Sequence, residues 1–237
     1  MARYSPLSLI LDKLRHEARL STNPAHNAQV RATHVNMLQR TQERLWRDFA
    51  WPHLTTEWKL PLQNGQRIYD TPANLDIDRI DRIEVFRDGV WAPLSYGVNN
   101  SHYASWNSDL DQRSWPPRAW RIVPDEDLEI WPIPNRDAVP ATLEGMLRFT
   151  GTRKLRPLVA NTDTADLDDD MLALYCAAEM LAAGGAKDAQ LKLEAANLSY
   201  AKQRSGLSPR RSVRMYGIGE PELSRRPFVS SYRPPGS

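Results

Sequence analysis

The chain has 237 residues, of which 41% are hydrophobic and 25% are charged, and its formal net charge is +2. These values are ordinary for a globular protein and exclude a chain that is disordered throughout. A membrane-spanning helix needs about 18 consecutive apolar residues, and Glu179 interrupts even the most hydrophobic segment, so the sequence predicts a soluble protein.

Two helices are predicted at the N-terminal end of the chain. The first is expected to start at Ser5-Pro6, where serine caps and proline opens a helix, and to end near Leu20. The second, of about 22 residues, is expected to end at Trp51-Pro52. Its apolar stripe consists of Val30, Met37, Thr41, Leu45 and Phe49.

From Thr55 the apolar period changes to two residues, which is typical of a strand with one buried face. Arg87-Asp88-Gly89 is predicted to form a hairpin turn, because glycine tolerates positive φ. Residues 96–117, rich in Asn, Ser, Asp and Trp, are expected to form a long exposed loop. Further strands are predicted at 80–86, 90–94, 120–123, 128–133 and 143–150. Together these strands predict a compact antiparallel domain.

A linker at about Gly151 to Ala165 is expected to lead back into helices. Asp168-Asp169-Asp170 places negative charge in the first turn of a predicted helix, which Gly184-Gly185 terminates. A last helix is predicted from Lys187 to Arg204. The tail that follows, residues 207–237, is rich in proline and arginine, so we expect it to be disordered when alone.

The predicted fold class is therefore α+β. The N-terminal and C-terminal helices are expected to form one bundle, with an antiparallel β domain inserted between them and an extended C-terminal tail. The expected parts are 1–54 for the N-terminal helices, 55–160 for the β-rich insertion, 161–206 for the C-terminal helices and 207–237 for the basic tail.

Charge is distributed unevenly over these parts. Residues 161–201 carry 2 Lys/Arg against 8 Asp/Glu, a net charge of −6, whereas residues 202–237 carry 8 against 2, a net charge of +6. The C-terminal part thus joins an acidic helical segment to a basic tail.

The sequence contains no metal, cofactor or catalytic motif. Its five histidines lack metal-site spacing, no phosphate-binding loop is present, and the single Cys176 lies in an apolar helical run typical of a buried thiol. Paired acids can hydrolyse glycosides, but here the acids alternate with arginines or lie in a predicted turn, which favours solvated surface acids. The candidates are Asp76, Asp78, Asp81 and Asp125-Glu126-Asp127. We therefore expect no enzyme activity, no metal and no cofactor.

The eight tryptophans suggest two uses. Trp106, Trp115 and Trp120 could form a platform on which carbohydrate stacks. Most of the others fall where a core or a domain junction needs bulk. They are Trp46, Trp51, Trp58 and Trp131.

The basic tail holds the candidate partner-binding residues. Its arginines are interleaved with aromatic side chains, a pattern that suits nucleic acid, through phosphates and stacking, or a protein surface. A solubilising tail without a partner is the plain alternative. The candidates are Arg210, Arg211, Arg214, Tyr216, Arg225, Arg226, Phe228, Tyr232 and Arg233.

Three features resemble the head-to-tail adaptor (connector) proteins of tailed bacteriophages, including podovirus tail tubular and tail accessory adaptor proteins. They are the helix ending Arg44-Leu45-Trp46-Arg47-Asp48-Phe49-Ala50-Trp51-Pro52-His53-Leu54, the β-rich insertion, and the helix from Asp168 to Ala183. The resemblance covers most of residues 5–204. It implies a structural virion protein that forms a ring, usually of twelve subunits, below the portal, continues the DNA channel and joins the tail.

The resemblance also implies the partners and the location. The partners would be the portal protein ring, adjacent adaptor subunits, a downstream tail or nozzle protein, and viral DNA passing through the channel, with no membrane. The protein would act at the head-tail junction of the virion and be found in the host cytoplasm during assembly. The basic tail would pair with acidic surface on the portal or on the −6 segment of an adjacent subunit.

Two alternatives stay open beside the adaptor. The first is a nucleic-acid-binding protein that uses the basic tail. The second, ranked last, is a cell-wall hydrolase that uses acids of the β domain such as Asp125 and Glu126.

Overall fold

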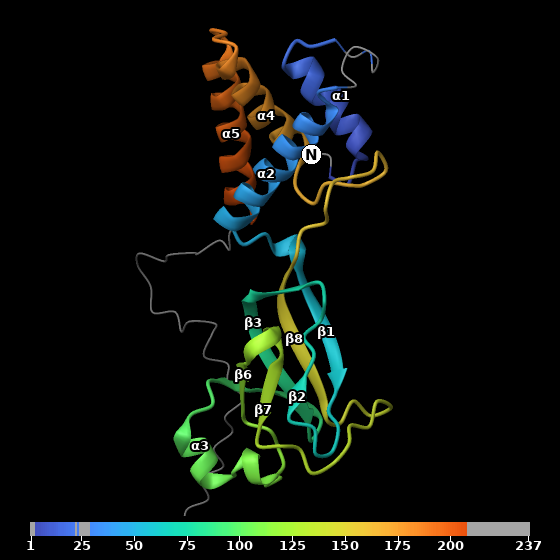
Figure 1. Ribbon diagram of the computed structural model, residues 1–237, viewed down its shortest axis with the longest axis vertical. Helices are drawn as coiled ribbons and strands as arrows, with labels where there is room; N and C mark the ends of the chain where they lie inside the picture. Colours follow the sequence, from blue (N-terminus) through green and yellow to red (C-terminus); the bar gives the residue numbers. More distant parts are fainter. Residues whose placement is uncertain (1–2, 22, 24–28, 208–237) are drawn as a thin grey trace, which may run out of the picture. The chain divides into compact units, whose positions relative to one another are not determined.

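The computed structural model describes residues 3–21, 23 and 29–207. The chain separates after Leu207 into two units, and the second, residues 208–237, lies outside the described residues. Within the first unit the chain forms a helical part from its two ends and a β part from its middle (Figure 1). The fold is α+β, as the sequence predicts.

The helical part contains α1 (Leu7–Glu17), α2 (Arg31–Asp48), α4 (Asp169–Ala183) and α5 (Ala189–Leu207). Helix α4 lies at its centre and packs against the other three helices. Its own side chains are alanine or other apolar residues on most of its faces, so α4 can be buried on several faces at once. The residues that it contributes to the core include Met171, Leu172, Cys176 and Ala177, all 0% exposed.

Local sequence signals set the ends of these helices. The Asp168 carboxylate caps α4 by accepting a hydrogen bond from the Met171 amide at 3.0 Å, and Gly184 follows its last residue. Helix α1 is shorter than predicted, because Pro6 rather than Ser5 is its cap and the chain leaves the helix after Glu17. Helix α2 has 18 residues, because the backbone is already extended at Phe49.

The first sheet of the β part has the strand order β1-β8-β3-β4 and is antiparallel throughout. Its strands are β1 (Thr55–Pro61), β3 (Leu75–Arg87), β4 (Val90–Pro93) and β8 (Met146–Arg153). The turn between β3 and β4 is the predicted hairpin, with positive φ at both Asp88 (50°) and Gly89 (81°).

The second sheet has the order β2-β7-β6-β5. Its strands are β2 (Ile68–Tyr69), β5 (Ser95–Tyr96), β6 (Ala119–Ile122) and β7 (Leu128–Trp131). The two sheets share one core, to which the first contributes Ile83, Val85, Leu147 and Phe149 and the second Tyr69, Trp120, Leu128 and Ile130. The short strands β2 and β5 were not predicted, because two residues carry no detectable alternation.

The sheets are antiparallel, as predicted, apart from the two-residue pair of β5 with β6, which is parallel. Two expectations about the middle of the chain are wrong. Residues 151–153 are not linker but the end of β8. The predicted exposed loop at 96–117 contains helix α3 (Asn100–Ser105), capped by Asn99, whose side chain accepts from the backbone amides of the first turn. Asn99 is a typical cap residue, but a helix of 6 residues is too short to show the hydrophobic period of a helix in the sequence.

Candidate functional site

The helical part and the β part meet at Arg79, on strand β3. Its guanidinium donates to the backbone oxygens of Trp46 at 2.7 Å and Arg47 at 2.8 Å, which lie at the C-terminal end of α2. The same group lies 4.0 Å from the centre of the Trp46 ring. A cation that pairs with the last carbonyls of a helix is favoured by the helix dipole. Arg79 thus ties the end of α2 to the sheet.

Asp166 makes a second tie where the chain returns from the β part. Its carboxylate is 0% exposed and accepts from the Arg153 guanidinium at 3.0 Å and from the Arg156 amide at 2.9 Å. Its own amide donates to the Gln42 side chain of α2 at 3.1 Å. A buried carboxylate is stable only when paired in this way. The chain passes from the helical part to the β part after α2 and returns after β8. Side-chain hydrogen bonds of Arg79 and Asp166 therefore hold both of these connections.

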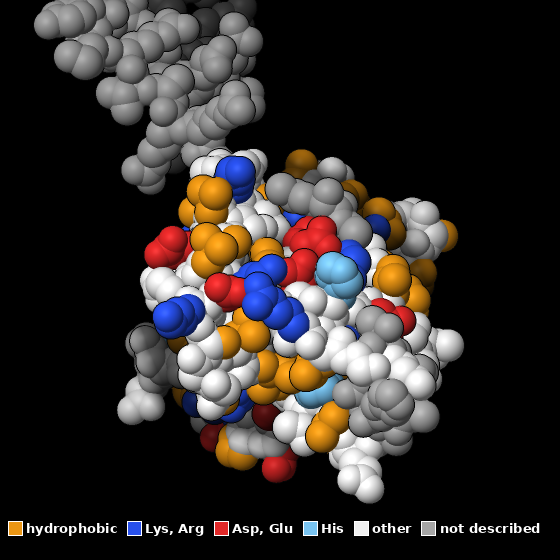
Figure 2. All heavy atoms as spheres, turned by 90° about the horizontal axis from the view of Figure 1, so that it is seen from above, with side chains coloured by type: hydrophobic (Ala, Val, Ile, Leu, Met, Phe, Trp, Pro, Cys, Tyr) orange, Lys and Arg blue, Asp and Glu red, His pale blue; other side chains and the backbone are white. Residues whose placement is uncertain are grey.

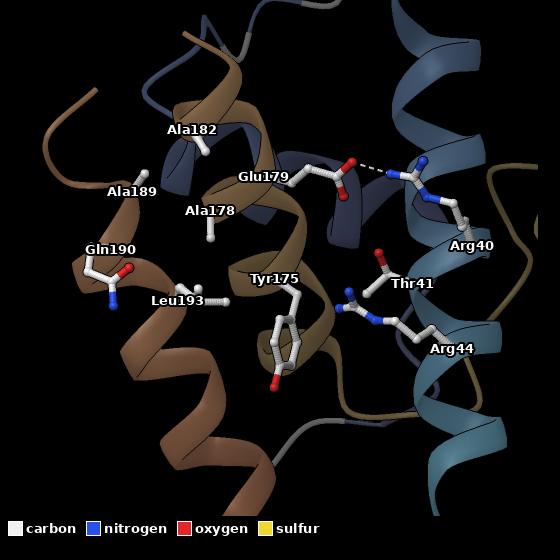
Figure 3. A pocket seen from close by; sticks show the side chains of 10 residues that line it. All are labelled: Arg40, Thr41, Arg44, Tyr175, Ala178, Glu179, Ala182, Ala189, Gln190 and Leu193. Carbon is white, nitrogen blue, oxygen red and sulfur yellow. Dashed lines mark hydrogen bonds and ion pairs between the residues drawn. The ribbon is translucent and has the colours of Figure 1, made fainter. Parts of the chain in front are cut away.

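A groove of about 430 Å³ lies between α2, α4 and α5 (Figure 3). Alanines of α4 and Leu193 of α5 form its apolar surface, and an ion pair between Arg40 and Glu179 closes one side. The Arg44 guanidinium lies 5.2 Å from the centre of the Tyr175 ring. Burial raises the pKa of the Tyr175 hydroxyl, which donates to Asn197 at 2.7 Å. The groove is apolar with a polar rim, a composition that suits a protein contact.

A second groove, of about 410 Å³, lies between α1 and α4. Leu9, Ala173 and Leu174 supply its apolar surface, and Lys13 pairs across it with Asp170 at 2.7 Å. This hydrogen bond raises the pKa of Lys13. The bundle therefore offers two different grooves, one on each side of α4, rather than a single self-complementary face.

Apolar side chains of α5 are also exposed on the bundle. Leu191 is 65% exposed and Leu198, seven residues later on the same helix face, is 57% exposed. In Figure 2, which views the bundle end of the described chain, apolar patches lie between basic and acidic side chains that are close together.

The acidic helical segment is largely neutralised within the subunit. Arginines and lysines from other parts of the chain pair with most of its carboxylates. The pairs are Lys13–Asp170, Arg19–Asp188, Arg40–Glu179 and Arg153–Asp166. The segment with net charge −6 in sequence thus presents less free negative charge than its composition indicates.

A buried polar network in the β part was not predicted from the sequence. Glu129 of β7 is 1% exposed and its carboxylate bonds Arg67 at 2.7 Å, Arg121 and the Tyr103 hydroxyl at 2.9 Å. Burial alone would raise the pKa of Glu129, but these hydrogen bonds outweigh it and lower the pKa. Since Tyr103 belongs to α3, the network fixes that helix on the second sheet.

The acids considered for catalysis are not brought together as a buried pair. Asp125 and Glu126 are exposed in the turn between β6 and β7, both with positive φ. Asp76 pairs with Arg79 at 3.7 Å. Asp78 and Asp81 are exposed on strand β3. These positions agree with surface acids.

The three tryptophans considered as a stacking platform have separate surroundings. Trp120 is 8% exposed and packs in the core between the sheets. Trp115 lies under the Arg136 guanidinium, 4.1 Å from the ring centre. Trp106 is 39% exposed, and its backbone oxygen accepts from the Trp131 indole at 2.9 Å. They do not share one open face.

Trp51 and Cys176 lie in the core of the helical part, as predicted. Trp51 is 1% exposed and donates to the Leu45 carbonyl at 3.0 Å. Burial raises the pKa of the Cys176 thiol to about 11, and its nearest polar partner is the Thr41 hydroxyl at 3.4 Å. Such a thiol is protonated and unreactive.

Two further observations concern the described part of the chain. Across residues 3–21, 23 and 29–207, no three His, Cys, Asp or Glu side chains form a group that could hold a metal ion. In the same ranges no helix is both long and apolar enough to cross a membrane. The candidate partner-binding residues of the tail, Arg210 to Arg233, lie outside the described residues.

Comparison with known proteins identifies the family. No curated protein matches the chain. The model of the SU10 adaptor protein family matches residues 7–219, which includes the helical part, the β part and the first residues of the tail. The chain therefore belongs to the SU10 adaptor protein family and is a bacteriophage adaptor protein.

Proposed function

We propose that this protein is a head-to-tail adaptor that forms a ring below the portal, continues the DNA channel and joins the tail, as in the podovirus adaptors that it resembles. The family match over residues 7–219 carries the proposal. The partners would be the portal ring, neighbouring adaptor subunits, usually twelve in all, and a downstream tail or nozzle protein. The protein would act at the head-tail junction of the virion after assembly in the host cytoplasm.

The bundle has the surfaces that a ring requires. A closed ring needs a heterologous contact, in which one surface of a subunit meets a different surface of the next. The groove between α1 and α4 and the exposed Leu191 and Leu198 of α5 are two such different apolar surfaces. We expect the ring to form on the portal.

The basic tail is proposed as the portal-binding segment. The acids of residues 161–201 are largely paired within their own subunit, which favours the portal over the acidic segment of a neighbour as the tail's acceptor. The interaction should weaken as salt rises, because exposed charges are screened within about 10 Å at 0.1 M salt.

Light scattering on a sizing column tests the function. The protein is measured alone and mixed with its cognate portal ring. A portal peak that gains the mass of many adaptor chains supports the adaptor and gives the stoichiometry. A portal peak without added mass contradicts it, and steep, salt-sensitive binding to duplex DNA would then favour the nucleic-acid alternative.

The same assay tests the role of the tail. The full chain carrying Arg210→Gln, Arg211→Gln and Arg214→Gln should bind the portal more weakly at low salt. The full chain carrying Arg82→Gln, which removes an exposed arginine of strand β3, should bind normally. Equal binding by both variants would remove the tail from the portal contact.

A further inference from the structure

A cleft of about 460 Å³ lies between the two sheets of the β part. One wall comes from strand β3 and the other from β5 and β6. Its apolar lining residues are Ile77, Ile80, Tyr96, Trp120 and Ile122. Tyr96 is 74% exposed, and its ring meets the Trp120 ring at 4.8 Å. An aromatic side chain exposed to this degree beside an apolar cleft is a surface that a partner can cover.

The β3 wall of this cleft is an open sheet edge. Strand β4 pairs only with residues 84–87 of β3, so in the described chain residues 76–82 have no strand partner on that side. Side chains from both faces of this stretch line the cleft, as expected at an edge. Unpaired backbone groups at such an edge can accept an extended peptide as an added strand.

The rim of the cleft is acidic. Asp78 and Asp81 both line it, and no described lysine or arginine forms an ion pair with either one. They differ in this from Asp170, Glu179 and Asp188 of the helical part, each of which pairs with a lysine or arginine. Arg47 and Arg79 line the neighbouring hollow with these two acids but form no ion pair with them. An apolar cleft with two such carboxylates fits a peptide that carries both arginines and apolar residues.

The chain itself supplies such a peptide after Leu207. Helix α5 ends at Leu207, and the Arg204 guanidinium lies 3.7 Å from the Asp48 carboxylate. Asp48 lines a hollow of about 370 Å³ together with Asp78 and Asp81, the acids of the cleft rim. The last turn of α5 therefore lies near these acids, and 12 extended residues can span about 40 Å.

The first part of the tail has the required composition. Residues 208–219 contain three arginines and no acid, with four larger apolar side chains: Val213, Met215, Tyr216 and Ile218. The family match extends through residue 219, so this stretch belongs to the region that the family shares.

We propose that in the free subunit residues 208–219 bind in cis to this cleft as an extended strand along residues 76–82 of β3. Its arginines face the rim acids and its apolar residues cover Tyr96. The contact is small and partly electrostatic, so it is weak and sensitive to salt. The proposal builds on the proposed function, because the portal would then take the tail from this cleft when the ring assembles.

Hydrogen exchange of the full-length protein, without portal, tests the proposal. Amides of residues 76–82 should exchange several-fold more slowly at low salt than at 0.5 M salt. The triple variant Arg210→Gln, Arg211→Gln and Arg214→Gln should lose this protection at low salt. Equal exchange in the wild type and in this variant would overturn the proposal.

A matched control carries the same charge change outside the proposed segment. The triple variant Arg225→Gln, Arg226→Gln and Arg233→Gln should keep the wild-type protection. Loss of protection in both variants would show a nonspecific charge effect and would also overturn the proposal.

A second experiment tests the cleft. The double variant Asp78→Asn and Asp81→Asn is made, and hydrogen exchange of the backbone amides of residues 208–219 is measured. These amides should exchange faster than in the wild type, whereas Asp125→Asn with Asp127→Asn, two acids of the β6–β7 turn, should have no effect. Unchanged exchange in the first pair would contradict the assigned cleft.

Protein concentration separates the chain's own tail from that of a second copy. If the tail binds in cis, protection from exchange is independent of protein concentration. Protection that grows with concentration would show that the tail of another copy fills the cleft, and it would overturn the proposal. Because no portal is present in these measurements, their failure would leave the portal-binding result of the sizing experiment unaffected.

Discussion

Replacing Arg79 with alanine should destabilise the connection between the bundle and the β part. The substitution removes two charged hydrogen bonds, at 2.7 and 2.8 Å, and a guanidinium 4.0 Å from the Trp46 ring centre. The side chain is 23% exposed, so each bond is counted at about 1 kcal/mol, the net value of an ordinary hydrogen bond and below the range for charged groups. The helix-end charge and the ring contact add about 0.5 kcal/mol each.

These contributions are not additive, and we expect a loss of about 2 kcal/mol. For a domain of this size that loss lowers Tm by about 4–8 °C. Thermal unfolding followed by circular dichroism gives the shift, and hydrogen exchange should show faster exchange at the C-terminal end of α2, where the two acceptor carbonyls lie.

Arg82→Ala is the matched control. Arg82 lies on the same strand, but its side chain is 55% exposed and its partner Glu84 is 3.5 Å away, so its removal should cost less than about 0.5 kcal/mol. If the Arg79 and Arg82 variants unfold at the same temperature, the junction is not held by Arg79 and the reasoning fails.

Three further predictions concern the helical part. Leu172→Ala should cost about 2–5 kcal/mol because Leu172 is 0% exposed, whereas Leu191→Ala, at a 65% exposed position, should change stability by less than about 0.5 kcal/mol; denaturant unfolding compares them. Burial raises the pKa of Asp169, so the stability that its protonated form contributes is lost as pH rises through the folded-state pKa; Asp169→Asn should therefore gain stability over the wild type as pH rises above about 4, and a difference that does not change with pH would contradict this. Because the pKa of Cys176 is about 11, a thiol reagent at pH 8 should modify it slowly in the native protein and rapidly after unfolding, and fast native labelling would show that the core opens.

Signals within short stretches of sequence were sufficient to predict helices α1, α2, α4 and α5 and the longer strands. The Asp168 cap, the Gly184 stop and the turn at Asp88-Gly89 act through backbone groups only a few residues away. The same locality explains the errors. Helix α1 ends at Glu17 rather than near Leu20. Helix ends fray, and the assigned position of a helix end varies by one or two residues.

The surroundings of the charged residues could not be predicted in this way. The composition of residues 161–201 indicates an acidic segment, yet Glu179 pairs with Arg40 and Asp188 with Arg19, partners more than 100 residues distant in sequence. Likewise Glu129 looks like a surface residue of an alternating strand, and only the packing of Tyr103 and Arg67 over it makes it a buried carboxylate.

By itself, the sequence determined the α+β class, the order of the main elements, the buried thiol and the resemblance to phage adaptors, because hydrophobic period, caps and turn residues act locally. Only the tertiary structure decided the parallel pairing of β5 with β6, the place of α3, the Arg79 tie and the open edge of β3 beside Asp78. These features depend on which distant segments pack together, and that choice is made by the burial and pairing of the whole chain rather than by any one stretch of it.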